Sequence, residues 1–331
     1  MVTPTPLGPG PEFDLIRRFL SRSRQSGPDI LVGPGDDCAV LEDGRIAISA
    51  DLSIEDVHFR RAWLGPEEIG RRAAAAALSD LAAMAASPVG ALVALGAPAS
   101  DVPDFAERCM AGATELLEAE GALLLGGDVA RSPGPLLLDV VVLGRVERPV
   151  LRSGARPGDE VWVTGTLGAA AAAVRCWAAG KEPPARAREA FASPRPRIRE
   201  ALWLAERDLP RAMLDLSDGL VGDAAHLAAA GGVGILLDEE QIPVDGVAID
   251  VAGREGGLAL ALGGGEDYEL CFVATPGAVQ AVAREFEDTF GIALTRVGVV
   301  REEPGIALRR GDGSIAPPDV EGYRHFAGGG R

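Results

Sequence analysis

The chain has almost no lysine. Lys181 is the only one in 331 residues that carry 32 basic side chains and a formal net charge of -17. A P-loop ends in Gly-Lys-Ser or Gly-Lys-Thr, whereas Lys181 is followed by Glu182. A protein kinase needs a strand lysine and a His-Arg-Asp loop, and the sequence contains neither. These absences exclude the P-loop and protein-kinase ways of holding a nucleoside triphosphate.

The sequence also has no run of basic residues that could neutralise nucleic-acid phosphates, so we expect no nucleic-acid partner. With this net negative charge, ATP without a metal ion would be repelled.

The four cysteines are far apart and form no Cys-x-x-Cys pair. They are Cys38, Cys109, Cys176 and Cys271. This spacing excludes a zinc site and predicts reduced thiols in a cytoplasmic protein. Met1–Pro11 lacks the pattern of a signal peptide. The longest apolar stretch, Leu81–Ala99, is interrupted by Ser87 and Pro88, so we expect no membrane span.

Acidic residues gather in short clusters beside glycine or serine, each next to an apolar run. The clusters are Gly35-Asp36-Asp37, Ser49-Ala50-Asp51, Ser79-Asp80, Gly126-Gly127-Asp128, Asp215-Leu216-Ser217-Asp218 and Gly264-Gly265-Glu266-Asp267. Carboxylate oxygens are the ligands that Mg²⁺ prefers, and Mg²⁺ commonly carries nucleotide phosphates. Carboxylates collected at the ends of several elements therefore predict a multi-metal site and phosphoryl transfer.

Strand-like and helical runs alternate in both halves of the chain, which predicts an α/β or α+β fold. Helices are expected over Glu12–Ser26, Pro66–Ala86, Val102–Glu120, Leu167–Ala179, Arg197–Glu206, Ser217–Ala230 and Pro276–Phe290. Gly180–Ala192 is expected to be a polar surface segment. A boundary near Pro149–Pro157 predicts two domains, residues 1–150 and 151–331.

Two clusters are hard to explain by turn chemistry alone. Asp36 and Asp37 repel each other without a cation. Asp80 lies in a very apolar helix, where an unpaired carboxylate is costly, so we expect it to face metal ions.

Other polar positions have specific local interpretations. Gly126-Gly127-Asp128 is predicted to be a turn whose glycines let the backbone approach a phosphate. Ser217 is predicted to cap a helix with Asp218 in its first turn, which leaves Asp215 unexplained. His58 is a candidate contact for a substrate phosphate, and His226 is predicted to be structural.

Taken together and in this order, the motifs resemble those of the thiamine-monophosphate kinase family over about Phe13–Phe326. The most specific matches are Leu78-Ser79-Asp80-Leu81-Ala82-Ala83-Met84, Asp215-Leu216-Ser217-Asp218-Gly219-Leu220, Gly264-Gly265-Glu266-Asp267-Tyr268-Glu269-Leu270 and Gly322-Tyr323-Arg324-His325-Phe326. That family is part of the fold group of aminoimidazole ribonucleotide synthetase and selenophosphate synthetase.

The resemblance implies two α/β domains per subunit and a homodimer in which the N-terminal strands form a shared barrel. Residues 1–150 would bind ATP and Mg²⁺ and form the dimer, and residues 151–331 would complete the active site. The implied reaction is ATP-dependent phosphorylation of thiamine phosphate to thiamine diphosphate. It would proceed by direct in-line phosphoryl transfer with several Mg²⁺ ions.

The resemblance also implies roles for individual residues. The implied metal ligands are Asp37, Ser49, Ala50, Asp51, Asp80, Asp128, Asp215 and, for a more peripheral ion, Asp218. The catalytic residues among them are Asp51, Asp80, Asp128 and Asp215. The ATP contacts are Gly127, Asp128, Arg152 and Ser217. The thiamine phosphate contacts are His58, Glu266 and Tyr323.

Four places depart from the family pattern: Ala50 replaces Thr, Ala77 replaces Asn, Ala85 replaces Gly, and Val129-Ala130 replaces two threonines. None of them removes a carboxylate, although Ala50 offers a metal only its backbone carbonyl.

Two alternatives stay open. One is another ATP-using synthetase of the same fold group, which would want a reactive Cys or Lys in a Gly-rich N-terminus. The chain has Gly8-Pro9-Gly10 there, with neither residue. The other is a catalytically impaired nucleotide-binding homologue, which would bind ATP without turnover.

Overall fold

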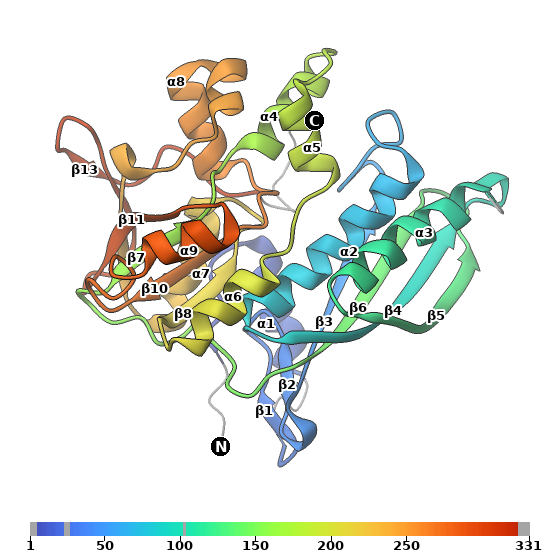
Figure 1. Cartoon of the computed structure of the whole chain (residues 1–331), viewed down its shortest axis with the longest axis horizontal. Helices are drawn as coiled ribbons and strands as arrows, with labels where there is room; N and C mark the ends of the chain where they lie inside the picture. The colour runs from blue at the N-terminus through green and yellow to red at the C-terminus, as the bar shows by residue number, and fades with distance from the viewer. Residues whose placement is uncertain (1–4, 23–26, 102–103, 324–331) are drawn as a thin grey trace.

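The computed structural model describes residues 5–22, 27–101 and 104–323. Two mixed sheets organise this part of the chain, one from each half of the sequence (Figure 1). The predicted two-domain α/β fold is confirmed, and the boundary at residue 150 stays a prediction. His325 and Phe326 of the terminal motif lie outside the described residues.

The N-terminal sheet has the strand order β1-β2-β3-β6-β4-β5, and β4–β5 is its parallel pair. Its strands are β1 Ile30–Val32, β2 Ala39–Leu41, β3 Ile46–Ile54, β4 Ser87–Ala97, β5 Leu123–Arg131 and β6 Leu137–Arg145. Helices α2 (Pro66–Ala83) and α3 (Asp104–Ala119) cover one face (Figure 1). The opposite face exposes apolar side chains, such as Leu52 and Leu92.

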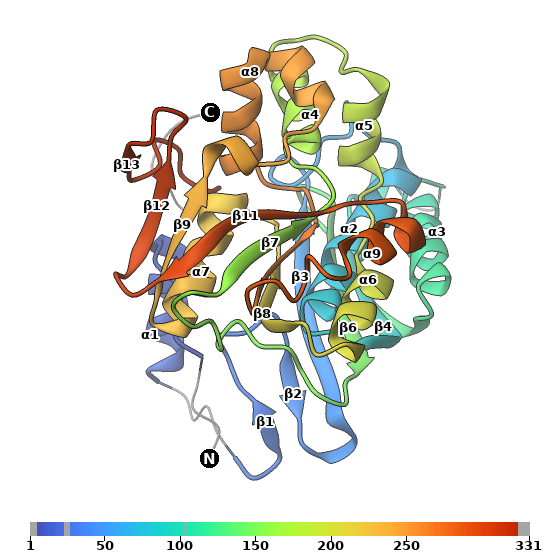
Figure 2. The same cartoon turned by 60° about the vertical axis from the view of Figure 1, so that its left-hand side comes forward.

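The C-terminal sheet has the strand order β13-β12-β9-β11-β7-β10-β8, and β9–β12 is its parallel pair (Figure 2). Its strands are β7 Glu160–Thr164, β8 Pro210–Asp215, β9 Gly234–Asp238, β10 Leu270–Ala274, β11 Leu294–Arg301, β12 Gly305–Arg309 and β13 Ile315–Ala316. Every residue of β10 is buried, because the sheet is covered on both faces. Cys271 and Val273 pack with α7 (Leu220–Gly231) in one core. Phe272 packs on the other face.

The second core is shared by the two halves of the chain. Leu78 and Leu81 of α2 belong to the same buried cluster as Met213 and Phe272 of the C-terminal sheet. The cluster also contains residues of α6 (Ile198–Glu206) and α9 (Ala283–Phe290). Helix α2 therefore packs against both sheets and fixes their relative position.

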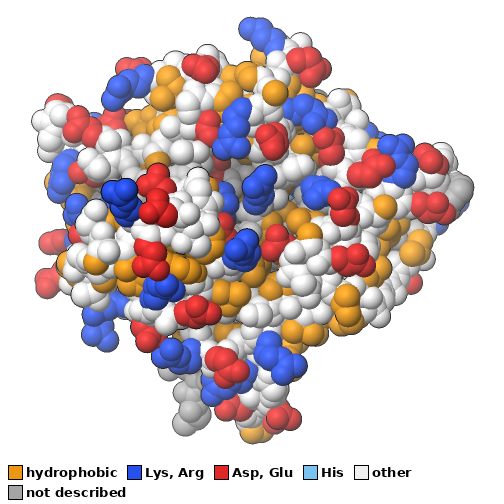
Figure 3. All heavy atoms as spheres, viewed as in Figure 1, with side chains coloured by type: hydrophobic (Ala, Val, Ile, Leu, Met, Phe, Trp, Pro, Cys, Tyr) orange, Lys and Arg blue, Asp and Glu red, His pale blue; other side chains and the backbone are white. Residues whose placement is uncertain are grey.

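Four further helices complete the described fold: α1 Pro11–Leu20, α4 Ala169–Ala178, α5 Ala185–Ala192 and α8 Gly246–Gly263. Single 3₁₀ turns lie at η1 Asp43–Arg45, η2 Ala99–Asp101 and η3 Glu239–Gln241. Helices α4, α5 and α8 form one layer above the C-terminal sheet (Figures 1 and 2). On the face shown in Figure 3, acidic and basic side chains are interspersed. Within the described ranges, no helix combines the length and apolarity of a membrane span.

The structure corrects several predicted elements. The segment predicted as polar surface contains α5, and α8 was not predicted. The helix expected from Pro276 begins only at Ala283. Gly126-Gly127-Asp128 is not a turn but lies inside β5 and pairs with β4, and both glycines have φ 154°, a backbone conformation that favours glycine.

Two glycines let α2 and α3 cross closely. A methyl group at Gly70 would lie 1.7 Å from the carbonyl oxygen of Cys109, and one at Gly112 would lie 2.0 Å from that of Glu67. These contacts are to backbone atoms, so a side chain at either position would push the helices apart. The two glycines therefore fix the position of α2, the helix that contains Asp80, against α3.

Gly70→Ala is expected to lower the free energy of unfolding by about 1–3 kcal/mol or more, because overpacking must displace a helix. Chemical denaturation would measure the loss. Gly246→Ala is the matched control, since nothing lies within 4 Å of a methyl group at the first residue of α8. Equal stability of the two variants would contradict the role given to this crossing.

Candidate active site

Three predicted carboxylates meet where the two halves of the chain join. Asp37 lies between β1 and β2, Asp80 in the last turn of α2, and Asp215 at the end of β8. One carboxylate oxygen of each lies within 4.8 Å of the others. We call these residues the carboxylate cluster.

Strand β3 presents two more predicted ligands to the carboxylate cluster. The Ser49 hydroxyl donates a hydrogen bond of 2.5 Å to Asp80 Oδ2. Because side chains alternate along a strand, Asp51 points to the same helix-covered face as Ser49. Ala50 is exposed and its side chain points to the opposite face, so only its backbone is available to a ligand.

Arg152 is the cation paired with this group in the described structure. Its guanidinium donates to both carboxylate oxygens of Asp37, at 2.7 and 3.0 Å, and its backbone N–H donates to Asp36 Oδ1 at 2.7 Å. Burial opposes the charge of Arg152, but the Asp37 and Asp36 carboxylates outweigh it and raise the pKa of the guanidinium. One arginine therefore faces several carboxylates.

The excess negative charge shifts the acid equilibria of the carboxylate cluster. Burial and the nearby charges of Asp215 and Asp37 raise the pKa of Asp80 well above its usual range. Burial and the charge of Asp37 raise the pKa of Asp215 to about 7. Buried oxygen donors with too little positive charge are the donor set that suits a hard divalent cation. The residues present therefore fit Mg²⁺.

A second group surrounds the predicted substrate contacts His58 and Glu266. Arg72 of α2 donates to the Glu266 carboxylate, to the Phe191 carbonyl at 2.7 Å and to the His58 carbonyl at 3.4 Å. The Tyr268 hydroxyl also donates to Glu266, at 2.8 Å. The structure thus brings His58 and Glu266 together around a residue that was not predicted.

The sequence did contain a signal for Arg72. It is a charged residue in the same Ala-rich helix as Asp80, eight positions earlier, and an unpaired buried charge is costly there too. Asp51 lies between the two groups. After burial and closer charges, its carboxylate contributes to the raised pKa values of Asp80, Asp215 and Tyr268. The two groups are therefore neighbouring parts of one site.

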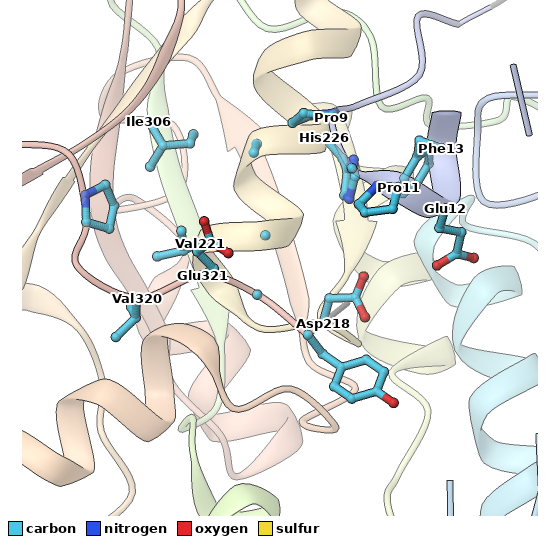
Figure 4. Close-up of a pocket in the computed structure, with 16 residues that line it drawn as sticks. Pro9, Pro11, Glu12, Phe13, Asp218, Val221, His226, Ile306, Val320 and Glu321 are labelled. Atoms are coloured by element: carbon cyan, nitrogen blue, oxygen red, sulfur yellow. The ribbon is translucent and has the colours of Figure 1, made fainter. Parts of the chain in front are cut away.

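Asp218 belongs to a separate cluster with Asp223 and His226, whose ligand atoms lie within 4.8 Å of one another. Figure 4 shows Asp218 and His226 beside a pocket of about 200 Å³ that Glu12 and Phe13 also line. Burial lowers the pKa of His226 to about 4. The imidazole ring packs against the Phe13 ring, with 4.3 Å between the two ring centres. These contacts agree with the structural role predicted for His226.

Ser217 is not the helix cap that the sequence predicted. Helix α7 begins after Gly219, and Asp223 Oδ2 accepts the N–H groups of Asp218 and Gly219 at 3.1 and 3.0 Å. The Ser217 carbonyl instead accepts the N–H of Glu266 at 2.8 Å. A carboxylate four residues into the helix supplies the cap, which frees the Ser217 side chain from that task.

Tyr323 lies against Asp218, to whose carbonyl its N–H donates at 2.9 Å. Burial, then the charges of Glu266 and Asp218, raise the pKa of its hydroxyl. The third predicted substrate contact is therefore within the electrostatic reach of Glu266.

Gly127 and Asp128 do not join these groups within one chain. Register pairs Asp51 with Val140, Val140 with Val93, and Val93 with Gly127. Asp128, one residue further, therefore points to the uncovered face, three strand spacings or roughly 14 Å from β3. It is exposed there, and its carboxylate accepts the N–H of Val129 at 2.9 Å.

The departures from the family pattern have simple structural consequences. Ala77 is fully buried in α2, and Val129 is 70% exposed on β5. Ala85 adopts φ 53° at the end of α2, where Ala86 N–H bonds the Leu81 carbonyl at 2.8 Å. The helix therefore ends in the left-handed conformation that usually requires glycine, although the residue at this position is alanine.

Comparisons with known proteins match both halves of the chain. The N-terminal and C-terminal domain models of the AIR synthase related proteins match residues 35–146 and 156–311. The thiamine-monophosphate kinase of Salmonella typhimurium is 35% identical over 96% of this chain and 98% of its own length. AaThiL complexed with AMPPCP and TMP aligns over 96% of this chain and 97% of its own, with TM-score 0.80 and 30% identity. The thiamine-monophosphate kinase of Stenotrophomonas maltophilia aligns over 92% and 96%, with TM-score 0.75 and 34% identity.

The raised pKa of Asp215 makes the metal-free protein sensitive to pH. Between the unfolded value near 4 and the folded value of about 7, the folded state keeps a proton that the unfolded state releases. Stability is therefore present at low pH and lost as pH rises towards 7, by on the order of 2–4 kcal/mol.

Denaturation of metal-free protein between pH 5 and 8 would measure this loss. Asp215→Asn should reduce this loss, while the raised pKa of Asp80 keeps part of it, and Mg²⁺ should offset more of it in the wild type than in the variant. Asp288→Asn, on an exposed side chain of α9, is the control and should behave as wild type. A wild-type curve that is flat over this range would contradict the assignment.

Proposed function

The chain belongs to the thiamine-monophosphate kinase family, within the AIR synthase related proteins, and we propose that it transfers the γ-phosphoryl group of ATP to thiamine phosphate. The product is thiamine diphosphate, and the enzyme acts in the cytoplasm. The observation that carries this proposal is the carboxylate cluster beside the His58, Arg72 and Glu266 group. One part suits a metal–nucleotide, and the other suits an organic acceptor.

Asp37, Asp51, Asp80 and Asp215, with Ser49, would hold several Mg²⁺ ions. When bound, these ions neutralise the phosphate charge and align the triphosphate. Asp218 would hold a more peripheral ion. Arg152, held by Asp36 and Asp37, would place a fixed positive charge against the nucleotide phosphates, and Ser217 would contact the nucleotide beside it.

The transfer is a direct in-line displacement. An oxygen of the thiamine phosphate attacks the γ-phosphorus, a new P–O bond forms, and the bond to the β-phosphate oxygen breaks with its electron pair leaving on ADP. The attacking oxygen is already ionised, so no residue has to remove a proton. The chain contributes alignment and charge rather than a covalent group.

His58, Glu266 and Tyr323 would bind the acceptor. Thiamine carries a cationic thiazolium and an amino-substituted pyrimidine, both of which suit an ionised carboxylate such as Glu266. Among the described residues, Glu266 is paired with Arg72 and Tyr268 and is still partly exposed. It can therefore face a substrate while it is held by these two partners.

The synthetase alternative receives little support. Its reactive Cys or Lys is missing from the described N-terminal segment, and the nearest thiol, Cys38, is buried against Asp80. Burial and the Asp80 charge raise the pKa of Cys38 well above its usual range, so it is a poor nucleophile.

A turnover assay with ATP, Mg²⁺ and thiamine phosphate tests the kinase proposal, with thiamine diphosphate followed by chromatography. Product should require both ATP and Mg²⁺. Asp51→Asn should lower the rate roughly 10²-fold or more while the protein stays folded. Asp288→Asn should keep the wild-type rate. If folded wild-type protein binds ATP but forms no product, the impaired-homologue alternative replaces the kinase.

The enzyme is also proposed to be a homodimer that joins the uncovered faces of two N-terminal sheets in a shared barrel. This face and the β5 edge expose large apolar side chains at Leu52, Val89, Leu92, Leu123, Leu124, Leu125 and Val129. Gly127 and Asp128 lie on the same edge, away from the carboxylate cluster of their own chain. A second copy of this chain would cover the apolar surface and receive Asp128 and Gly127 at its own site.

Mixed dimers test this arrangement. Asp51→Asn and Asp128→Asn should each be inactive alone. Refolding them together in equal amounts should restore roughly a quarter of wild-type activity, because half of the dimers are mixed and each of these contains one intact site. If Asp128 served its own chain, every site would carry a substitution and the mixture would stay inactive.

A further inference from the structure

Arg72 is a buried cation whose contacts reach three separate segments. It is 3% exposed, and its guanidinium donates to the His58 carbonyl, the Phe191 carbonyl and the Glu266 carboxylate. These partners lie after β3, near the end of α5 and before β10. The guanidinium also lies over the Phe191 ring, 3.9 Å from its centre.

Two of these segments are ones proposed to contact thiamine phosphate. We infer that Arg72 is a positioning residue for the acceptor: it fixes the Glu266 carboxylate and the His58 loop in the arrangement that receives thiamine phosphate. The inference rests on the proposed function of this site, and it assigns Arg72 no contact with the substrate.

Backbone strain in the Glu266 segment supports this role. Glu266 and Tyr268 both have positive φ values, 67° and 50°, in a region that side-chain-bearing residues rarely adopt. Such strain persists only where surrounding contacts hold it, and it gathers at functional sites. Arg72 and the Tyr268 hydroxyl both bond Glu266 Oε2 and so hold the strained segment in place.

The Glu266 carboxylate also borders open space. It lines a cavity of about 240 Å³ together with Arg186, Ser193 and Arg197. Glu266 therefore binds a buried arginine and also borders open space from which a ligand could reach it.

The chemistry also explains why the residue is arginine. Three acceptors in different directions require the planar, forked donors of a guanidinium. A lysine would keep the charge but could not bond all three acceptors from one position. The Phe191 carbonyl is near the C-terminal end of α5, where unpaired carbonyls favour a cation.

The test measures KM for each substrate and the binding of thiamine phosphate by calorimetry, for Arg72→Met, Arg72→Lys and Glu266→Gln. Arg72→Met should raise KM and Kd for thiamine phosphate at least about tenfold, with KM for ATP changed less than about twofold. Arg72→Lys should recover part of the loss. Arg211→Met is the control, because it breaks the partly buried pair with Asp159 away from these contacts.

The double variant Arg72→Met with Glu266→Gln separates positioning from general stability. Because Arg72 acts in part through Glu266, the double variant should lose less affinity for thiamine phosphate than the sum of the two single losses. Additive losses, equal changes for both substrates, or a change in thermal stability alone would overturn the inference. Wild-type protein that binds thiamine phosphate without turnover would contradict the kinase and leave the binding comparison decisive for Arg72.

Discussion

The repulsion among buried carboxylates is the constraint on which the rest of the structure depends. Asp37, Asp80 and Asp215 come from three different elements, and folding forces them together with Arg152 as their cation in the described structure. Burying these charges together costs free energy, so the rest of the fold must hold the three elements in place. Helix α2 contributes to this, because it packs in a core shared by both sheets and crosses α3 at two glycines. Stability elsewhere thus offsets a locally unfavourable site that a metal ion would relieve.

Strand alternation divides the functional residues between two faces of one sheet. Ser49 and Asp51 face α2, whereas Ala50, Leu52 and Asp128 face the uncovered side. A single residue of register separates the two sets. The same sheet can therefore build a catalytic site on one face and an association surface on the other.

The sequence singled out Asp80 and Asp215 because each carboxylate is unusual for its local environment. Asp80 in an apolar helix and Asp215 at a strand end needed a partner, and the structure gives them one another. Local patterns failed where a distant contact decided the outcome. Ser217 looked like a cap, but Asp223 reaches back to take the two N–H groups. Gly126-Gly127 looked like a turn, but pairing with β4 keeps it extended. Arg72 was missed because its partners are distant in sequence.

Helix α2 also explains how the two parts of the site keep a fixed separation. Arg72 and Asp80 lie eight residues apart on this helix, a rise of about 12 Å along its axis. Arg72 binds the Glu266 carboxylate, and Asp80 joins the carboxylate cluster. Phosphoryl transfer depends on in-line alignment of donor and acceptor more than on any single group. Helix α2 is buried over most of its length, so it holds these two residues at a fixed spacing.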